Sequence, residues 1–335
     1  MSIVMTGGGT GGHLTIIKAV KEQLLNEELI YIGSTKGQDR AWFEKDTQFK
    51  STHFLPTRGV VNQGILGKIK SISMLIKATL TARKILKKSN AKVVFCVGGF
   101  SAAPTSFAAK TLGIPLIIHE QNGAIGSLNR LLRPYAKAFI SSYEENSPIK
   151  AYPIKTEYFE KSRIRENIKT IIFLGGSQGA VAINKLALSM ASTLKSKNIK
   201  IIHQAGERNI EEVKLEYKAL NIEAEVFGFT TSLSDYMQKA DFAIARSGAS
   251  TLWELSAMAC PTLYIPYPYA AGDHQFYNAK FLVDQKVAWI MREKEIEIEE
   301  VIAILDENMK EKSEKLQSMI EKDGALQIAE LLRKS

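Results

Sequence analysis

The sequence predicts an α/β protein made of two doubly wound domains that face each other across a cleft. Three observations predict this fold class. The chain has 335 residues, which is long for a single hydrophobic core. Apolar runs of β type alternate with helical patterns along its whole length. Each half also opens with a strand that leads into a glycine-rich loop, at residues 4–13 and 173–180.

The alternation predicts ten buried strands. Nearly continuous runs of Val, Ile and Leu between helices are typical of parallel sheets with both faces covered. The runs are 3–6, 29–32, 93–97, 116–118 and 138–140 in the first half, and 170–174, 200–204, 223–227, 242–245 and 262–265 in the second. Ligands of such sheets bind at the carboxyl ends of the strands, so we expect the active site in the cleft between the domains.

Charge is distributed unevenly along the chain. Residues 1–155 hold 21 Lys and Arg against 9 Asp and Glu, a net charge of +12, within a total net charge of +9. Nucleic acid, phosphoryl groups and acidic lipid are all anionic partners that such a half could attract. A solvated basic face is the simpler alternative.

The cysteines and the N-terminal residues indicate the cellular compartment of the protein. Cys96 and Cys260 lie far apart in apolar stretches, which favours reduced core residues over a disulfide or a metal site. We expect no signal peptide, and the uncharged stretch 93–109 is too short and too interrupted by Gly and Pro to span a membrane. The sequence therefore predicts a cytoplasmic protein whose membrane contact is peripheral.

The first glycine loop, residues 7–12, has the spacing G-x-G-x-x-G. Dinucleotide-binding proteins share this spacing but need a carboxylate near the end of the second strand, where this chain has Gly-Ser-Thr-Lys at 33–36. No Gly-Lys-Ser/Thr follows either, so the general prediction is anion binding by backbone N–H groups and a helix N-terminus. His13 ends the loop. A helix N-terminus disfavours imidazolium, so His13 is a candidate base, with capping or packing as the alternative.

Three stretches of the second half place polar side chains where strands lead into helices. Residues 175–179 repeat the glycine loop and add Ser177 and Gln178, with a structural tight turn as the alternative. Residues 246–254 open a helix whose amides point toward an anion. Glu254 lies one turn into that helix, where a carboxylate can accept both hydroxyls of a ribose. Residues 272–279 form a polar cluster that includes His274 and Gln275.

Together these motifs resemble those of the family-28 glycosyltransferases, which have two Rossmann-like domains in the GT-B fold. The resemblance covers nearly the whole chain. It rests on Gly-Gly-Thr-Gly-Gly-His at 8–13, His-Glu-Gln-Asn at 119–122, Gly-Gly-Ser-Gln-Gly-Ala at 175–180, Arg-Ser-Gly-Ala at 246–249 and Asp-His-Gln at 273–275. Within that family the match is to enzymes of peptidoglycan synthesis. It implies transfer of N-acetylglucosamine from UDP-GlcNAc to the 4-hydroxyl of MurNAc in lipid I, with inversion, giving lipid II and UDP.

The resemblance also implies which residues bind the donor. Phe229 and Thr230 would flank the uracil, Ser177, Gln178 and the 247–251 turn would hold the diphosphate, and Glu254 the ribose. His274 and Gln275 would contact the sugar. The full expected UDP-GlcNAc set is Thr10, Gly11, Gly12, Asn122, Lys155, Ser177, Gln178, Phe229, Thr230, Arg246, Ser247, Gly248, Ala249, Ser250, Thr251, Glu254, His274 and Gln275.

For the acceptor, the resemblance implies a pyrophosphate site at Gly8, Gly9, Thr10 and Gly11, with His13 and Asn122 as the catalytic residues. Lys155 stands where the family typically has arginine, and a lysine keeps the charge but loses bidentate phosphate contact. The chain contains no Asp-x-Asp motif, so we expect neither a metal nor another cofactor. Helix N-termini and amides would stabilise the leaving diphosphate instead.

The resemblance assigns residues 1–154, with a C-terminal helix at about 316–335, to an acceptor- and membrane-binding domain, and 155–315 to the donor domain. A basic, isoleucine-rich segment predicts contact with anionic lipid on the inner face of the cell membrane. Packing of its isoleucines on the sheet is the alternative. The residues expected at the membrane are Ile65, Lys68, Ile69, Lys70, Ile72, Ile76 and Lys77.

Several other functions fit parts of the sequence. A transferase with a different lipid acceptor and a non-hydrolysing UDP-GlcNAc 2-epimerase share the expected fold, although an epimerase has little use for the basic segment. A nicotinamide oxidoreductase would need the missing ribose acid. A nucleic-acid-binding module would explain the charge, but the basic region lacks interleaved aromatic residues. We therefore expect UDP-GlcNAc, lipid I, anionic lipids and other cell-wall synthesis proteins as partners, and no nucleic acid.

Overall fold

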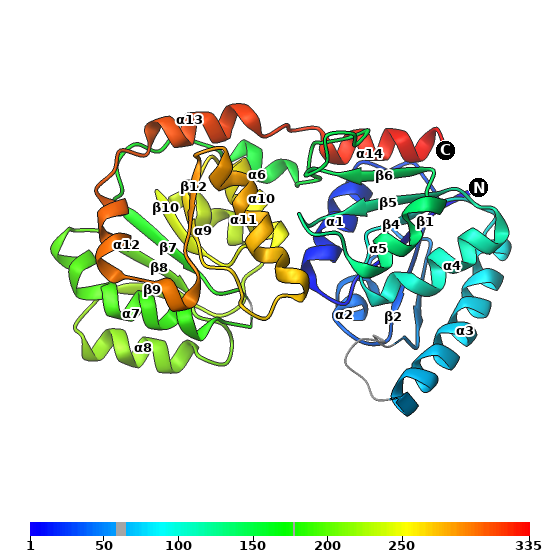
Figure 1. Ribbon diagram of the computed structural model, residues 1–335, viewed down its shortest axis with the longest axis horizontal. Coiled ribbons are helices and arrows are strands. Elements are labelled where there is room, and N and C mark those ends of the chain that lie inside the picture. The colour runs from blue at the N-terminus through cyan, green and yellow to red at the C-terminus, as the bar shows by residue number, and fades with distance from the viewer. Residues whose placement is uncertain (58–64, 177) are drawn as a thin grey trace. The chain divides into compact units, whose positions relative to one another are not determined.

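The computed structural model describes residues 1–57, 65–176 and 178–335, with the side chains of 65–69 left aside. The chain divides into two compact units. The first unit comprises Met1–Ile154 and Asp323–Ser335, and the second comprises Lys155–Lys322. Each unit contains its own parallel sheet with helices packed on it (Figure 1).

The first unit is built on a six-stranded parallel sheet of order β3-β2-β1-β4-β5-β6. The order reverses between β1 and β4, which is where doubly wound sheets bind their ligands. Both the loop after β1 and the loop after β4 are rich in glycine. The strands are β1 Ser2–Thr6, β2 Leu29–Ser34, β3 Ser51–Leu55, β4 Ala91–Cys96, β5 Leu116–Glu120 and β6 Ala138–Ser141.

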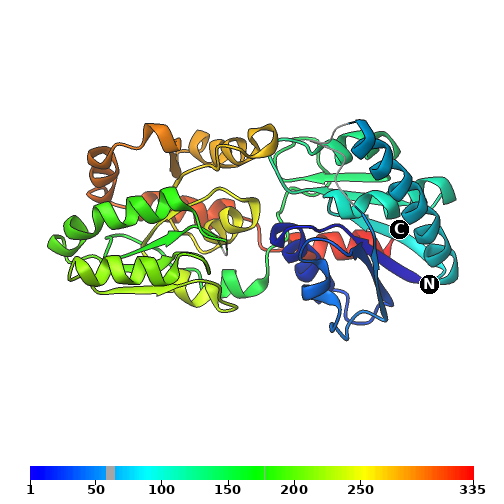
Figure 2. The ribbon, with the colours of Figure 1, turned by 90° about the horizontal axis from the view of Figure 1, so that it is seen from below.

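Helices cover this sheet and include the C-terminal end of the chain. Helix α3 packs on α4, and small or apolar residues of both, among them Ala78, Ala82 and Ala108, share a core with the sheet. The last helix, α14, packs on α1, which the blue and red ribbons show side by side (Figure 2). The helices are α1 Gly11–Glu22, α2 Asp39–Phe43, α3 Ile65–Lys88, α4 Ala103–Leu112, α5 Ser127–Leu132 and α14 Gly324–Arg333.

The second unit repeats this topology with a six-stranded parallel sheet of order β12-β11-β10-β7-β8-β9, which reverses between β7 and β10. Its strands are β7 Thr170–Leu174, β8 Lys200–Gln204, β9 Ala224–Phe227, β10 Phe242–Ala245, β11 Thr262–Tyr264 and β12 Ala288–Ile290. Its helices are α6 Thr156–Glu160, α7 Val181–Ser196, α8 Ile210–Ala219, α9 Leu233–Lys239, α10 Ala249–Ala257, α11 His274–Asp284, α12 Ile298–Leu305 and α13 Lys310–Met319.

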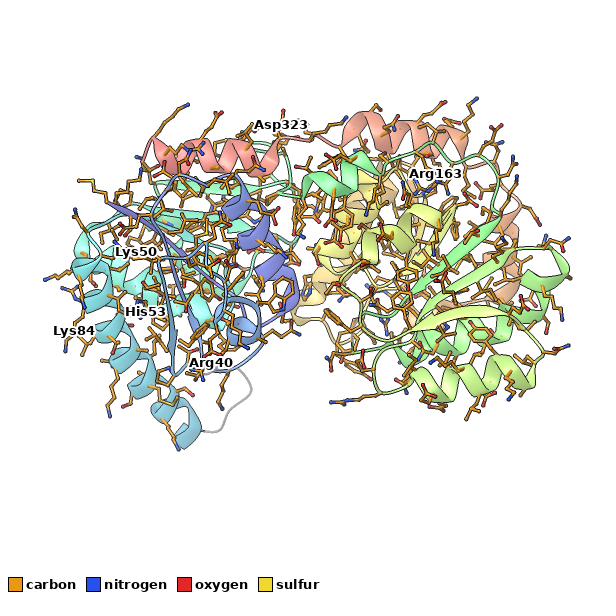
Figure 3. All side chains as sticks on the ribbon, turned by 180° about the vertical axis from the view of Figure 1, so that it is seen from behind. Arg40, Lys50, His53, Lys84, Arg163 and Asp323 are labelled. Atoms are coloured by element: carbon orange, nitrogen blue, oxygen red, sulfur yellow. The ribbon has the colours of Figure 1, made fainter. Side chains whose placement is uncertain are left out.

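A buried arginine joins several elements of the second unit. Arg165 is fully buried, and its guanidinium donates to the carbonyls of Ala240, Met237 and Met258, at or near the C-termini of α9 and α10. Unpaired carbonyls at helix ends favour a cation. The neighbouring Arg163 pairs with Asp241 at 2.6 Å and is labelled in Figure 3. Burial lowers the pKa of Arg165 from its ordinary value.

The predicted fold class is confirmed, and each of the ten predicted runs contains a strand. Two strands were not predicted, β3 and β12, and both lie at a sheet edge. The chain returns to the first unit at Asp323, later than the expected residue 316, because α13 packs with the second unit. Among the described residues, no helix combines the length and apolar character that crossing a bilayer requires.

Candidate active site

The first glycine loop joins β1 to α1 through backbone that only glycine adopts readily. Gly9 has φ of +86°, and a Cβ atom there would lie 2.6 Å from the ring of Phe100. A Cβ on Gly8 would lie 2.5 Å from a carboxylate oxygen of Asp39. The loop therefore needs glycine to fit between the loop after β4 and a buried carboxylate that the sequence analysis did not single out.

Asp39, the first residue of α2, holds this loop from inside the unit. Its Oδ2 accepts a hydrogen bond from the Gly9 amide at 2.6 Å, and its Oδ1 accepts from the Ser34 amide at 3.0 Å. The Tyr31 hydroxyl lies 3.0 Å from Oδ1 and 2.8 Å from the Gly7 carbonyl oxygen. Burial, and then the charge of Asp39, raise the pKa of Tyr31, so it remains a hydroxyl.

These contacts determine which backbone amides of the glycine loop are available to bind an anion. The Gly9 amide donates to Asp39, and the Gly8 amide donates to the Gly98 carbonyl at 3.3 Å. The amides at the start of α1, beginning with Gly11, are the ones that a helix leaves without intrahelical partners. The anion-binding capacity of the loop thus lies at Gly11 and Gly12 rather than at Gly8 and Gly9.

His13 lies in the first turn of α1 with both ring nitrogens in hydrogen-bond contact. Nδ1 is 2.9 Å from Oγ1 of Thr10, and Nε2 is 3.0 Å from the amide nitrogen of Gln121. Gln121 directly follows β5, which is separated from β1 by β4 alone, so the carboxyl ends of these parallel strands bring the histidine of the first motif to the second. His13 is half-buried, whereas Gln121 is only 7% exposed.

The residues around Gln121 are fixed by a second buried carboxylate. Glu120 accepts hydrogen bonds from the amide of Asn122 at 3.0 Å, from the amide of Gly126 at 2.9 Å and from Nδ2 of Asn129 at 2.9 Å. The side-chain amide of Asn122 also reaches Glu120, at 3.3 Å. His119 is fully buried. Burial, and then the proximity of His13, lower the pKa of His119 to about 3, so it stays neutral.

In the second unit, the N-terminus of α10 forms the best-defined candidate for anion binding. Gly248 caps the helix, and Ser247 before it is fully buried, with a hydroxyl that has no hydrogen-bond partner among the described residues. Asn278 of α11 donates to the Ser247 carbonyl at 3.1 Å and thereby fixes this turn. Ala249, Ser250 and Thr251 form the first turn of α10, as the sequence predicted.

Arg246, expected at the donor site, makes several contacts within the second unit. Its guanidinium donates to the carbonyls of Ile265 and Pro266 at 3.0 and 3.1 Å and forms an ion pair with Glu293. It also lies over the ring of Tyr267, 5.6 Å from the centroid. In this conformation Arg246 holds the loop after β11 in place, and its charge is already paired.

Glu254 is half-buried on α10 beside residues from the start of the second unit. Burial raises the pKa of Glu254 to about 7, against the opposing effects of the Lys155 charge and a hydrogen bond from Tyr158. Tyr158 lies on α6 and is almost fully buried. Lys155 also contacts Glu157 at 3.2 Å. The expected residues Glu254 and Lys155 are therefore brought together, and Tyr158 is a third member that the sequence gave no reason to select.

The other expected donor residues lie on loops. Phe229 is 59% exposed, and its amide donates to Glu207 at 2.6 Å, while Oγ1 of Thr230 accepts from the Ser232 amide at 3.0 Å. Nδ1 of His274 lies 2.9 Å from the Ala271 carbonyl oxygen, and Gln275 accepts from the Tyr267 amide at 2.9 Å. Gln178 is exposed, and Ser177 lies outside the described residues.

The basic helix α3 presents part of its isoleucine stripe to solvent. Ile72, Ile76 and Leu80 are 49%, 56% and 55% exposed. Lys70 and Lys77 are exposed as well. The face that packs inward contains Ala78 and its neighbours instead. The side chains of Ile65, Lys68 and Ile69, also expected at a membrane, lie outside the described residues.

The described part of the chain contains no group of three or more His, Cys, Asp or Glu side chains placed to hold a metal ion. What the two units do contain is a set of glycine-rich loops and helix N-termini at the carboxyl ends of parallel strands. Together with a partly buried carboxyl on α10 and a histidine on α1, they are the features of a GT-B-type α/β enzyme.

Comparison with known proteins identifies the family. Models of the N-terminal and C-terminal domains of glycosyltransferase family 28 match residues 3–141 and 170–332. The chain belongs to glycosyltransferase family 28. It is 67% identical over 333 residues to a UDP-N-acetylglucosamine--N-acetylmuramyl-(pentapeptide) pyrophosphoryl-undecaprenol N-acetylglucosamine transferase of Sulfurovum sp., covering 99% of this chain and 98% of the relative. A protein of the same description from Wolinella succinogenes is 50% identical over 334 residues, covering 99% of both chains.

Solved structures agree with this membership. The crystal structure of Acinetobacter baumannii MurG matches with a TM-score of 0.81 at 26% identity, covering 100% of this chain and 99% of that one. A UDP-GlcNAc 2-epimerase from Neisseria meningitidis, bound to UDP-GlcNAc, matches with a TM-score of 0.63 at 13% identity, covering 100% of both chains. The second likeness shows the shared fold alone. The resemblance seen in the sequence motifs is thus confirmed at the level of the family.

Proposed function

We propose that this chain transfers N-acetylglucosamine from UDP-GlcNAc to the 4-hydroxyl of the MurNAc in lipid I, an undecaprenyl-pyrophosphoryl-MurNAc-pentapeptide. The products are lipid II, with a new β-1,4 linkage, and UDP. The observation that carries this proposal is the 67% identity, over nearly the full length of both chains, to the Sulfurovum transferase of that description. The reaction belongs to bacterial cell-wall synthesis.

The second unit is proposed to bind the donor. The first turn of α10, beside the buried Ser247 hydroxyl that has no partner in the described part of the chain, supports binding of the diphosphate, because helix amides and hydroxyl groups are good donors to phosphate oxygens. Glu254, on the same helix, is proposed to accept hydrogen bonds from the ribose hydroxyls in its ionised form, which its pKa of about 7 allows at neutral pH and above. The exposed Phe229 offers an aromatic face to the uracil.

The first unit is proposed to bind lipid I and supply the base. Its pyrophosphate would meet the α1 N-terminus at Gly11 and Gly12. Nε2 of His13 takes the proton of the MurNAc 4-hydroxyl while that oxygen attacks C1 of the N-acetylglucosamine. The bond from C1 to the UDP oxygen breaks, its electron pair leaves with UDP, and the configuration at C1 inverts. Amides at the α10 N-terminus stabilise the charge on the departing diphosphate, so the proposed reaction uses no metal ion.

Attachment to the inner face of the cell membrane is proposed through α3. Ile72, Ile76 and Leu80 form an exposed apolar stripe, and lysines flank it. Lys84 projects away from the helix, as Figure 3 shows. Each basic residue held near anionic lipid contributes about 1 kcal/mol, and a few of them together with an apolar edge give reversible attachment.

The test is release of UDP from UDP-GlcNAc with and without a short-chain lipid I analogue, with UDP-GalNAc and UDP-glucose as alternative donors. Release that requires the analogue and prefers UDP-GlcNAc is expected. Turnover of UDP-GlcNAc without any acceptor would contradict the proposal and point to an epimerase or a hydrolase. Acceptor-independent binding of the donor with no release would indicate a different acceptor.

A further inference from the structure

The contacts of His13 determine which ring nitrogen carries its proton. A neutral imidazole has one nitrogen that donates and one that accepts. The group facing Nε2 is the side-chain amide nitrogen of Gln121, at 3.0 Å, and an amide nitrogen can only donate. Nε2 must therefore be the nitrogen with the lone pair, and the proton lies on Nδ1, from which it is donated to Oγ1 of Thr10 at 2.9 Å.

Thr10 alone could not fix this arrangement. A hydroxyl both donates and accepts, so Oγ1 of Thr10 is an equally good partner for a protonated and an unprotonated Nδ1. The amide nitrogen of Gln121 has no such freedom. With the Gln121 amide nitrogen facing Nε2, as the structure has it, Gln121 sets the tautomer of His13, and Thr10 adapts to it.

Burial of Gln121 and the fixed backbone after it place its side chain beside His13. It is 7% exposed and lies between β5 and the loop that Glu120 fixes through the amides of Asn122 and Gly126. Its Oε1 is buried without a hydrogen-bond partner among the described residues. A buried amide oxygen left in this way is available to a hydroxyl donor that arrives with a ligand.

We propose that Gln121 is a positioning residue for His13. Its amide donates to Nε2, keeps the ring in the Nδ1–H tautomer, and thereby holds at Nε2 the lone pair that removes the acceptor proton. In the acceptor-free protein this amide covers the lone pair. The acceptor hydroxyl replaces it there, and the displaced side chain can accept from the acceptor through Oε1. The catalytic role rests on the proposed function, but the tautomer does not.

The direct test is the ring ¹⁵N spectrum of the full-length protein labelled in histidine, recorded at mildly alkaline pH. The chain has five histidines, and a His13→Gln variant assigns the signals of His13. We expect a protonated Nδ1 and an unprotonated Nε2. An Nε2–H tautomer in the wild-type protein would overturn the proposal. Because the wild-type spectrum alone gives this answer, it does not depend on any variant folding.

A matched pair of variants tests the cause. Gln121→Leu removes the donor and should shift His13 toward the Nε2–H form. Gln48→Leu makes the same change at a half-buried glutamine of the same unit, which donates to the Lys21 carbonyl at 2.7 Å, and should leave the His13 spectrum unchanged. A His13 tautomer that is unchanged in Gln121→Leu would show that another group sets it and would overturn the proposal.

Kinetics separate the positioning role from the proposed function. Gln121→Leu should lower kcat by roughly 10- to 100-fold with little change in KM for UDP-GlcNAc, because a wrong tautomer removes the base without touching the donor. A shifted tautomer with an unchanged kcat would overturn the positioning role. If the wild-type protein shows no acceptor-dependent UDP release, the proposed function fails, and the ¹⁵N spectrum still decides the tautomer.

Discussion

The carboxylate of Asp39 accepts a hydrogen bond from the backbone amide of Gly9, with 2.6 Å between Oδ2 and the nitrogen. Asp39 is fully buried, and its other oxygen accepts from the Ser34 amide. One side chain thus ties the glycine loop after β1 to the turn after β2. Because the loop leads directly into α1, this contact also determines where the helix N-terminus and His13 lie.

Replacement of Asp39 by asparagine should weaken binding of the acceptor substrate and leave donor binding unchanged. Whichever way the new amide turns, one backbone amide, that of Gly9 or Ser34, meets an NH₂ group instead of an oxygen acceptor. We expect unfolding of the first unit to become easier by about 1–3 kcal/mol, the cost of an unsatisfied buried donor. KM for the acceptor should rise severalfold, while calorimetric binding of UDP should not change. Loss of UDP binding together with acceptor affinity would contradict a role confined to the first unit.

The raised pKa of Glu254, about 7, predicts a pH dependence of donor binding. Above that pH the carboxylate can accept both ribose hydroxyls, and below it one oxygen carries a proton. Calorimetry should therefore show UDP affinity falling severalfold between about pH 8 and about pH 6. Glu254→Gln should bind UDP more weakly with a flat pH profile. A wild-type profile as flat as that of the variant would show that Glu254 does not contact the ribose.

The raised pKa of Glu254 affects stability in the opposite direction, because a rise in pH favours donor binding but lowers the free energy of unfolding. The pKa of Glu254 in the folded protein lies above its ordinary value near 4.5, so the folded state holds its proton more tightly than the unfolded state. Stability is therefore lost as pH rises from the ordinary value through about 7, and the full penalty applies above it. Glu254→Gln removes this penalty. The free energy of unfolding of the variant should fall less than that of the wild type over the same rise in pH, in urea titrations.

The fold was predictable because its central strands are buried on both faces and are therefore nearly continuous apolar runs. The two strands that were missed lie at the edges. Strand β3 reads Ser-Thr-His-Phe-Leu and is only half-buried, and β12 has three residues. At an edge one side of the strand lacks a neighbour, so polar residues are tolerated, and in β3 the apolar run that marks a strand disappears. Strand β12 is apolar, and its shortness is what made it hard to recognise.

The roles of individual site residues were less predictable where they depend on contacts with residues far away in the sequence. Residues 33–36, where a ribose acid would follow the second strand, contain no carboxylate, whereas Asp39, just beyond them, accepts a hydrogen bond from the glycine loop. Arg246 follows its strand as expected, yet its charge pairs with Glu293, 47 residues later. On α3 the sequence left the direction of the isoleucine stripe open, since the inward face includes Ala78 and Ala82 beside Leu86, and alanines do not stand out as core residues.

Arg165 should be among the most sensitive positions for stability in the second unit. Its replacement by alanine removes the donor of the Met258 carbonyl and one of the donors to the carbonyls of Met237 and Ala240, and it leaves a cavity where a fully buried side chain stood. We expect the free energy of unfolding to fall by about 3 kcal/mol or more, measured by chemical denaturation. The exposed Arg208→Ala serves as the control and should change it by less than about 0.5 kcal/mol. Equal effects of the two substitutions would contradict the structural role of Arg165.

Membrane attachment through α3 predicts a separation between lipid binding and chemistry. An Ile72→Ser/Ile76→Ser variant should bind vesicles of phosphatidylglycerol and phosphatidylethanolamine at least about tenfold more weakly in a sedimentation assay, because it loses two exposed apolar side chains. Turnover of a water-soluble lipid I analogue should stay at the wild-type level. The matched control is Leu215→Ser on α8, a side chain that is 67% exposed in the second unit.

Salt provides the second half of this measurement. Wild-type binding to the same vesicles should weaken as salt rises, because salt screens the attraction of Lys70 and Lys77 to anionic lipid. The binding that remains at high salt comes from the apolar side chains, and the double serine variant should lack it. Equal weakening by Leu215→Ser would indicate a general effect of surface polarity. Unchanged vesicle binding by the α3 variant would place the lipid contact on another surface, because the exposed stripe would then be shown to make no contribution.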